Sequence, residues 1–149
     1  RLGAEYVAED NTRKVPVMLH RAMLGSLERW IGMLIEEYAG AFPVWLAPVQ
    51  AAIAPITDAQ AGYVKEVALK LHQAGIRVQT DLRSEKINYK IRELSLQKIP
   101  YIAVVGEKEA AAGTVSIRGR GNKDLGVMKV EDFIAMVLKQ VAERTADQA

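Results

Sequence analysis

The chain of 149 residues contains no cysteine and only two histidines, and its net charge is only +2. Without cysteine it has no disulfide framework and no thiol nucleophile, which fits a reducing cytoplasm. No run reaches the ~18 apolar residues of a membrane span, and no secretory signal is visible. The phosphate-binding patterns GxGxxG and GxxxxGK[ST] are also absent, which disfavours a dinucleotide or P-loop site.

The small net charge does not by itself indicate a nucleic-acid partner. Between Arg77 and Lys123, however, ten Lys and Arg stand against five Asp and Glu, a local excess of +5. A phosphate-bearing partner would be attracted to such a segment. The alternative is a charge-rich face that is simply solvated. Half of the residues are apolar, and the length fits one domain with some additional chain.

An amphipathic helix is predicted to follow Ser26, which is a natural N-cap because its hydroxyl can accept a hydrogen bond from the first turn. Gly40 is expected to end the helix, and Pro43 prevents its continuation. The apolar positions follow helical spacing: Leu27, Trp30, Ile31, Leu34, Ile35 and Tyr38. Arg29, in the first turn, opposes the helix dipole. A docked anion would explain this position, and a solvated surface arginine is the alternative.

Strands and helices alternate along the rest of the chain. Residues 2–7 and 14–20 are predicted to pair as a β-hairpin across the turn at Glu9–Asn11. Further strands are expected at 76–80, 101–105 and 114–118, after an apolar extended segment at 44–56. Helices are expected from Thr57–Asp58 to Gly75, at 84–98 with Ile87, Ile91 and Leu94 inward, and at 130–144 with Phe133, Ile134, Val137, Leu138 and Val141 inward. Gly106 and Gly113 bracket a predicted turn, 119–122 a loop, and the tail from Thr145 is expected to fray.

This order predicts an α/β fold with a mixed, mainly parallel sheet covered by three helices, preceded by a β-hairpin and a helix. The boundary between the two parts is expected at residues 40–44. The N-terminal part then covers residues 1–42, and the second domain covers residues 43–149.

A long ordered series of segments resembles the threonyl-tRNA synthetase family, from its third conserved motif into its C-terminal anticodon-binding domain. The series is VPVMLHRAMLGSLERWIGMLIEEYAGAFPVWLAPVQ, then QAGIRV, DLRSEKINYKIRE, KIPYIAVVG and KDLG. It covers nearly the whole chain and is far more specific than a short motif. Such class II synthetases have several hundred residues before this point, and the chain begins at Arg1 with no initiator Met. We therefore expect it to be the C-terminal piece of a larger enzyme.

The resemblance implies roles for three residues of the N-terminal part. Arg29 is expected to contact the ATP triphosphate, which is used with Mg²⁺, and Ser26 to line the threonine side of the pocket. His20 is expected to ligate a zinc ion that selects threonine by its amine and hydroxyl. The other two zinc ligands, a Cys and a His, would lie upstream of Arg1, so this chain is not expected to hold the metal. By residue type alone, His20 would be a strand-end histidine with one backbone hydrogen bond.

For the anticodon, Glu109 and Arg118 stand where the family uses a carboxylate and a guanidinium against bases. Both types suit base edges, since Arg donates and Glu accepts hydrogen bonds. Two further positions depart from the family pattern: Ser84 replaces an Asn, and Lys98 replaces an Arg. Ser is shorter, and Lys cannot make the bidentate planar contact of Arg. The alternative for all four is an ordinary polar surface residue.

The implied function is that of a threonine–tRNA ligase, which activates threonine with ATP and transfers it to tRNA(Thr). This part is expected to recognise the anticodon and to carry motif 3 residues of the ATP site, and to be inactive alone. The whole enzyme is expected to be a cytoplasmic homodimer. The alternative is a non-catalytic tRNA-binding or accessory module derived from a synthetase C-terminus, which an open reading frame with the first two motifs upstream would exclude.

Overall fold

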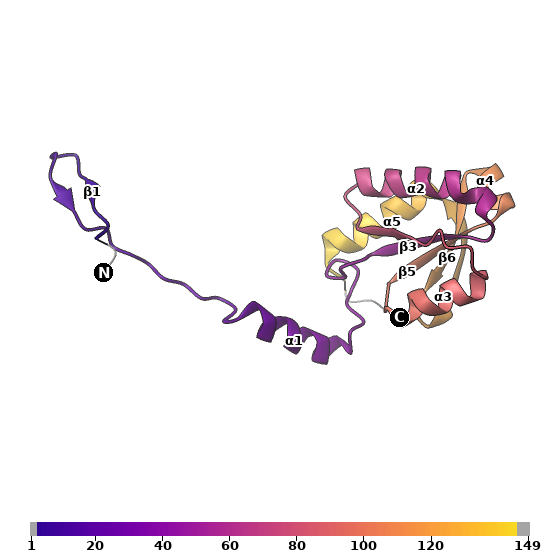
Figure 1. Ribbon diagram of the computed structural model, residues 1–149, viewed down its shortest axis with the longest axis horizontal. Coiled ribbons are helices and arrows are strands. Elements are labelled where there is room, and N and C mark those ends of the chain that lie inside the picture. Colours follow the sequence, from indigo (N-terminus) through magenta and orange to yellow (C-terminus); the bar gives the residue numbers. More distant parts are fainter. Residues whose placement is uncertain (1–2, 146–149) are drawn as a thin grey trace. The chain divides into compact units, whose positions relative to one another are not determined.

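The computed structural model describes residues 3–145 of the chain, and the contacts divide it into two compact units between Gly32 and Met33. The first unit holds a small β-hairpin, and the second holds a five-stranded sheet with its helices (Figure 1). The boundary expected after residue 42, between two functional domains, stays a prediction. Two predicted features, the start of the first strand at residue 2 and the fraying of 146–149, lie outside the described residues.

The predicted hairpin is present but much shorter than expected. Strand β1 (Tyr6–Val7) pairs antiparallel with β2 (Arg13–Lys14). In the turn, the Asp10 carboxylate accepts hydrogen bonds from the Thr12 hydroxyl at 2.6 Å and the Thr12 N–H at 3.1 Å. The strand predicted over 14–20 is wrong beyond Lys14, because residues 15–25 form neither strand nor helix. A two-stranded hairpin has no third strand or apolar face to extend it.

Helix α1 (Leu27–Tyr38) forms where the apolar spacing and the cap predict it. Ser26 Oγ accepts a hydrogen bond from the N–H of Arg29 at 3.2 Å, which confirms the N-cap. Gly40 adopts φ +76° and its N–H donates to the Ile35 carbonyl, which confirms the glycine ending. No residue of α1 is buried, and Leu27, Ile31, Met33 and Ile35 are each about half exposed or more.

The sheet of the second unit has the strand order β4-β3-β5-β6-β7. Strands β3 (Ala51–Pro55), β4 (Val78–Thr80) and β5 (Tyr101–Val105) are parallel, whereas β6 (Thr114–Gly119) and β7 (Asp124–Lys129) continue the sheet in antiparallel pairing. The mixed sheet is confirmed. Its described pairings are two parallel and two antiparallel, and the second antiparallel pairing is made by β7, which was not predicted. A short edge strand that contains a glycine and has no fully buried residue carries little periodic signal.

Helices cover the two faces of the sheet unequally. Helix α2 (Ala61–Gln73, after the 3₁₀ helix η1, Asp58–Gln60) and α5 (Val130–Glu143) cover one face, and α3 (Ile87–Leu96) covers the other (Figure 1). These are the three predicted helices. The short α4 (Glu107–Ala112) replaces the predicted turn, and the 3₁₀ helix η2 (Arg120–Asn122) lies in the predicted loop. Leu138 is 39% exposed, so its predicted inward position is wrong: it borders the stripe centred on Phe133 and Val137.

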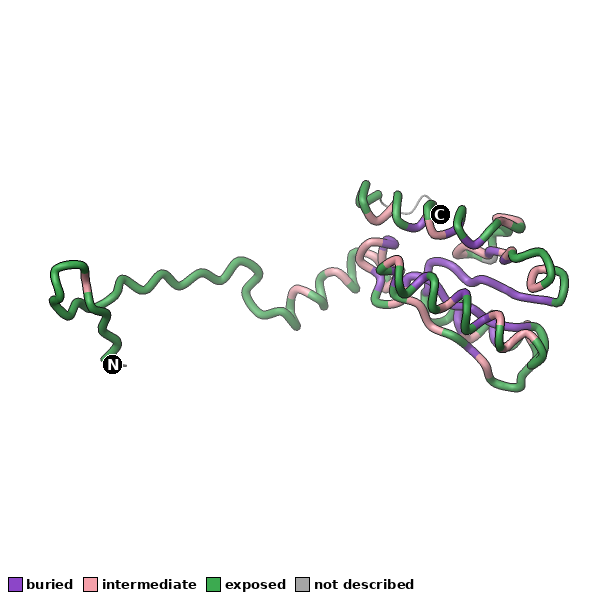
Figure 2. Tube along the Cα trace, turned by 90° about the horizontal axis from the view of Figure 1, so that it is seen from above, coloured by how far each residue is buried: buried purple, intermediate pink, exposed green. Residues whose placement is uncertain are grey.

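Successive side chains of the central strands, β3 and β5, point to opposite faces of the sheet. Both strands are buried along their whole length (Figure 2). Ile53 and Ala103 pack under α2 and α5, whereas Ala52 and Ile102 pack under α3. In β6, Val115 and Ile117 join the α2/α5 side. Ser116 and Arg118 therefore lie on the α3 side, where they are only partly buried.

Candidate nucleic-acid interface

Three loops meet at one edge of the sheet, because the carboxyl ends of parallel strands lie together. They follow β3 (residues 56–60), β4 (residues 81–86) and β5 (residues 106–109). We call this the carboxyl edge. Ser84 belongs to the second loop, and its hydroxyl donates to Asp58 Oδ2 of the first at 3.1 Å. The Ser84 side chain, which is predicted to contact the anticodon, thus links two of the three loops by a hydrogen bond.

Glu109 lies in the third loop, in the first turn of α4. Its Oε2 accepts a hydrogen bond from the N–H of Gly106 at 2.9 Å, which caps the helix and fixes the direction of the carboxylate. A Cβ at Gly106 would lie 2.8 Å from that oxygen and 3.0 Å from Ile56 Cδ1. A glycine is therefore required there for Glu109 to keep this position.

Arg118 lies farther from the carboxyl edge than Glu109. Its partner in β5 is Ile102, three residues before the end of that strand, which corresponds to about 10 Å along the sheet. On its other side, Arg118 is opposite Asp124 of β7, next to a bulge. Arg118 is thus presented by the part of the sheet that lies beside α3, partly buried.

Lys98 lies at the opposite end of the sheet from Ser84 and Glu109. It follows the end of α3 in a left-handed conformation (φ +60°), shortly before β5 begins. Its carbonyl accepts hydrogen bonds from Arg120 Nε at 3.1 Å and Nη2 at 2.9 Å. The structure therefore brings Ser84 and Glu109 to one edge, whereas Arg118, which pairs with the second residue of β5, lies towards the opposite end, where Lys98 precedes that strand.

The role of Arg120 was not predicted. Besides Lys98, its guanidinium donates to the carbonyls of Ala41 and Phe42, in the segment that follows α1. Arg120, Lys98 and Phe42 line a cavity of about 160 Å³ together with Gln97, Ile99 and the segment Ala47–Val49. A guanidinium can bind several carbonyls at once because it carries five donors, so Arg120 fixes this segment against the end of α3.

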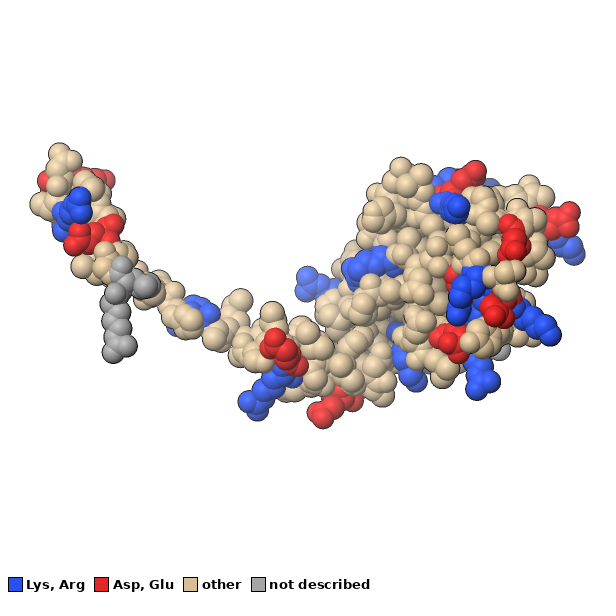
Figure 3. Space-filling model, in the orientation of Figure 1, with Lys and Arg blue, Asp and Glu red and all other residues tan. Residues whose placement is uncertain are grey.

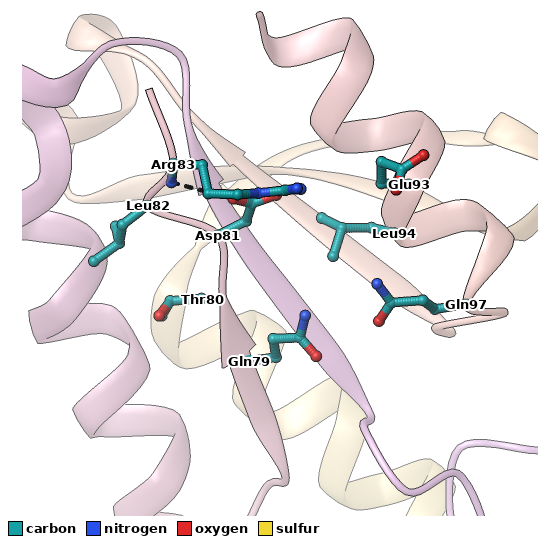
Figure 4. A pocket seen from close by; sticks show the side chains of 8 residues that line it. All are labelled: Gln79, Thr80, Asp81, Leu82, Arg83, Glu93, Leu94 and Gln97. Atoms are coloured by element: carbon teal, nitrogen blue, oxygen red, sulfur yellow. Dashed lines mark hydrogen bonds and ion pairs between the residues drawn. The ribbon is translucent and has the colours of Figure 1, made fainter. Parts of the chain in front are cut away.

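A group of three charges under the carboxyl edge, two of them buried, was also missed. Asp81, whose side chain is 4% exposed, binds Arg83 in a bidentate ion pair, with Oδ1–Nε at 2.9 Å and Oδ2–Nη2 at 2.7 Å. These hydrogen bonds, and to a lesser degree the charge of Lys90, hold the pKa of Asp81 below its ordinary value. Arg83 also lies over the Tyr89 ring at 5.8 Å. Figure 4 shows the Arg83 side chain extended across Asp81 towards α3, at a cavity of about 230 Å³ that Gln79, Glu93 and Gln97 also line.

Lys90 is the third charge of this group and is only 1% exposed. Its Nζ donates to the carbonyl of Pro55, the last residue of β3, at 3.2 Å. Helical spacing could have indicated its burial, because Lys90 lies three residues after Ile87 and four before Leu94 on the inward stripe of α3.

The basic excess of the segment 77–123 is partly used inside the fold. Four of its ten cations bind backbone or a buried carboxylate: Arg77, Arg83, Lys90 and Arg120. On the face shown in Figure 3, Lys and Arg side chains alternate with Asp and Glu over the second unit. Specific contacts, and not a uniform positive surface, must therefore carry any selective recognition of a nucleic acid.

The residues predicted for the ATP and zinc sites are exposed. Ser26 Oγ donates to Glu28 Oε2 at 2.8 Å, and Arg29 follows in the first turn of α1. This hydrogen bond contributes to the lowering of the Glu28 pKa, after the backbone of Glu28 itself. His20 lies in the irregular segment before α1. Within residues 3–145, no three His, Asp or Glu side chains cluster closely enough to hold a metal ion. The described residues do not form a zinc site, so the role of His20 stays a prediction.

Comparison with known proteins identifies relatives of both the sequence and the fold. Residues 50–140 match the family model described as anticodon binding domain. The chain is 66% identical over 148 residues to a threonine–tRNA ligase of Delftia acidovorans, covering 97% of this chain and 23% of that protein. A threonine–tRNA ligase of Herminiimonas arsenicoxydans is 64% identical, with 95% and 22% covered. The chain thus spans about a quarter of the length of these relatives.

Solved structures agree with this match. The RNA-binding domain of threonyl-tRNA synthetase from Cryptosporidium parvum is similar with a TM-score of 0.74 and 34% identity, covering 80% of this chain and 30% of that one. Prolyl-tRNA synthetase from the same organism has a TM-score of 0.61 and 26% identity over 68% of this chain and 22% of that one. None of the helices in the described part of the chain has the length and apolar character needed to cross a membrane.

Proposed function

The chain belongs to the anticodon-binding domain family, and on that basis we propose that it is the anticodon-recognising part of a threonine–tRNA ligase. The observation that carries the proposal is the match of residues 50–140, which contains Ser84, Lys98, Glu109 and Arg118 together with the whole sheet. The identity of more than 60% to proteins named threonine–tRNA ligase supports threonine as the amino acid. The whole enzyme would activate threonine with ATP and Mg²⁺ and transfer it to tRNA(Thr).

The chemistry of the site explains how bases would be read. The Glu109 carboxylate, oriented by the Gly106 N–H, would accept a hydrogen bond from an amino or imino proton of an unstacked base. The Arg118 guanidinium would donate to base acceptors from the sheet. Since Arg118 lies about 10 Å back along the sheet from the end of β5 and Glu109 lies beyond that end, they would contact different bases of the anticodon. Ser84 would contact the RNA at the carboxyl edge beside Glu109, and Lys98 at the opposite end.

The N-terminal part would contribute to the catalytic site of the whole enzyme. Arg29 would bind the ATP triphosphate through its guanidinium, at a helix N-terminus that attracts anions. Ser26 would line the threonine side of the pocket, and its cap on α1 would keep this turn in place. His20 would supply one zinc ligand, and the remaining ligands would come from outside this chain. The Ser26 hydroxyl donates to Glu28 and caps α1, so we expect the serine to bind and not to react.

Binding experiments with three RNAs test this proposal. Fluorescence anisotropy would measure the dissociation constants of the chain for threonine tRNA, the same tRNA with an altered anticodon, and an unrelated tRNA. We expect the altered anticodon to cost about 1–3 kcal/mol of binding free energy for each lost base contact. Equal affinity for all three RNAs would contradict anticodon recognition and leave a general phosphate attraction.

A further inference from the structure

Lys90 lies beneath the ends of β3 and β4. Its ammonium is buried on α3 and donates to the Pro55 carbonyl at the end of β3. It also lies close enough to Asp81, the first residue after β4, to influence that carboxylate electrostatically. Lysine is almost never fully buried without partners, since burying an ammonium is costly. Here the hydrogen-bond partner is Pro55, the last residue of β3, and Asp81, which begins the next loop, supplies an opposite charge nearby.

Pro55 immediately precedes the first loop of the carboxyl edge, and Asp81 begins the second. The N–H of Asp81 donates to the Ile53 carbonyl at 2.9 Å, and its carboxylate accepts from the N–H of Arg83 at 3.2 Å. Asp81 therefore sets the course of the loop that leads to Ser84. Ser84 in turn binds Asp58 of the loop after Pro55. The hydrogen bonds of Lys90 to Pro55 and of Ser84 to Asp58 thus connect both loops to the helix α3.

We propose that Lys90 is a positioning residue for tRNA recognition, holding the loops 56–60 and 81–86 in the arrangement that presents Ser84 to the anticodon. This inference rests on the proposed function. An apolar side chain of similar length would fill the same space under the sheet but would leave the Pro55 carbonyl without its donor. The ammonium therefore anchors the end of β3, where the loop 56–60 begins.

The test compares Lys90→Met with a matched core variant. Methionine retains an unbranched side chain of similar length but removes the donor and the charge. Leu94→Ala changes a residue on the same face of α3, one turn later and equally buried. A leucine side chain cannot donate a hydrogen bond to a loop carbonyl. Lys90→Arg keeps a charge and donors. All variants are made in the 149-residue chain, and their folding is checked by circular dichroism.

Amide hydrogen exchange reports the loop geometry directly. In Lys90→Met, the amides of Asp81, Arg83 and Glu85 should exchange about tenfold faster, while those of β5 stay protected as in the wild type. In Leu94→Ala, exchange should rise across α3 and the sheet without preference for this loop. Unchanged exchange of the three loop amides in Lys90→Met would overturn the proposal.

The second measurement is the ratio of the dissociation constants for anticodon-altered and threonine tRNA. In Lys90→Met this ratio should fall about fivefold, in Leu94→Ala it should stay within about twofold, and Lys90→Arg should recover part of the loss. An unchanged ratio in Lys90→Met, or an equal fall in both variants, would overturn the positioning role. If the wild-type chain itself did not discriminate between the RNAs, the proposed function would fail first, and the exchange data would still show whether Lys90 orders the loops.

Discussion

At the scale of single residues, Asp81 and Arg83 show how the fold uses charge. The carboxylate is buried and accepts a bidentate pair of hydrogen bonds, while the arginine side chain is 52% exposed. Because water reaches the arginine, the pair contributes less than its short distances suggest. The pair orders the start of the loop at residues 81–86, and its energetic contribution should depend on the charge of Asp81.

The lowered pKa of Asp81 predicts an acid-dependent contribution to stability. A group whose pKa is lower in the folded state stabilises the fold above its unfolded pKa, near 3.8, and loses this contribution as pH falls through the folded value. Asp81→Asn should therefore cost about 1–2 kcal/mol at pH 7 and progressively less below pH 3.8. Urea unfolding at pH 7, 4 and 3 measures this. Arg83→Gln should show the same pH trend, and a cost independent of pH in both variants would contradict the assignment.

Gly106 offers a second test at this scale. A Cβ there would displace the Glu109 carboxylate from its N–H partner, so Gly106→Ala should lower the free energy of unfolding by about 0.5–2 kcal/mol, the value of a lost cap. It should also weaken discrimination between anticodons. The control is Gly62→Ala in α2, where nothing lies within 4 Å and alanine should be neutral or stabilising. Thermal unfolding and tRNA binding of both variants measure these two effects. Wild-type stability in Gly106→Ala would show that the cap is dispensable.

At the scale of elements, the periodic segments could be predicted from the sequence and the short ones could not. Helices α2, α3 and α5 each bury a stripe of apolar residues, and β5 is a wholly apolar run, so their patterns are strong. The six residues of α4 are too few for a stripe. Strand β7 contains Gly126 and pairs with β6 through a bulge. Its pairing with β6 is a property of the folded sheet and leaves no pattern in the sequence. The sequence indicated Glu109 and Arg118 through the resemblance. It did not indicate the hydrogen bond of Lys90 to Pro55, because the two residues are 35 positions apart in the chain.

Helix α1 carries a prediction about its exposed apolar side chains. Ile31, Met33 and Ile35 are about half exposed, and burying one such side chain is worth about 1.5–3 kcal/mol. The helix should therefore either associate with a second copy of the chain or exchange its amide hydrogens much faster than β3 and β5. Hydrogen exchange combined with analytical ultracentrifugation distinguishes these outcomes. Slow exchange throughout a strictly monomeric sample would contradict this expectation.

At the scale of the whole molecule, the chain corresponds to about a quarter of its ligase relatives. We expect it to bind tRNA but not to activate threonine, because Arg29 and Ser26 would form only part of the ATP and threonine sites. The measurement is threonine-dependent exchange of pyrophosphate into ATP, with a ligase of full length as the positive control. Exchange well above a blank without protein would show that the catalytic groups are complete in these 149 residues.

The most direct measurement of anticodon recognition is the binding of Arg118→Ala to three RNAs: threonine tRNA, an anticodon variant and an unrelated tRNA. If Arg118 reads a base edge, its loss should cost about 1–3 kcal/mol with threonine tRNA, and less with the variant that lacks the recognised base. Lys86→Ala serves as the control, because this exposed lysine at the end of the loop 81–86 would contact phosphate only: it should weaken all three RNAs about equally and flatten the salt dependence. An equal loss with all three RNAs for Arg118→Ala would contradict base recognition by this residue.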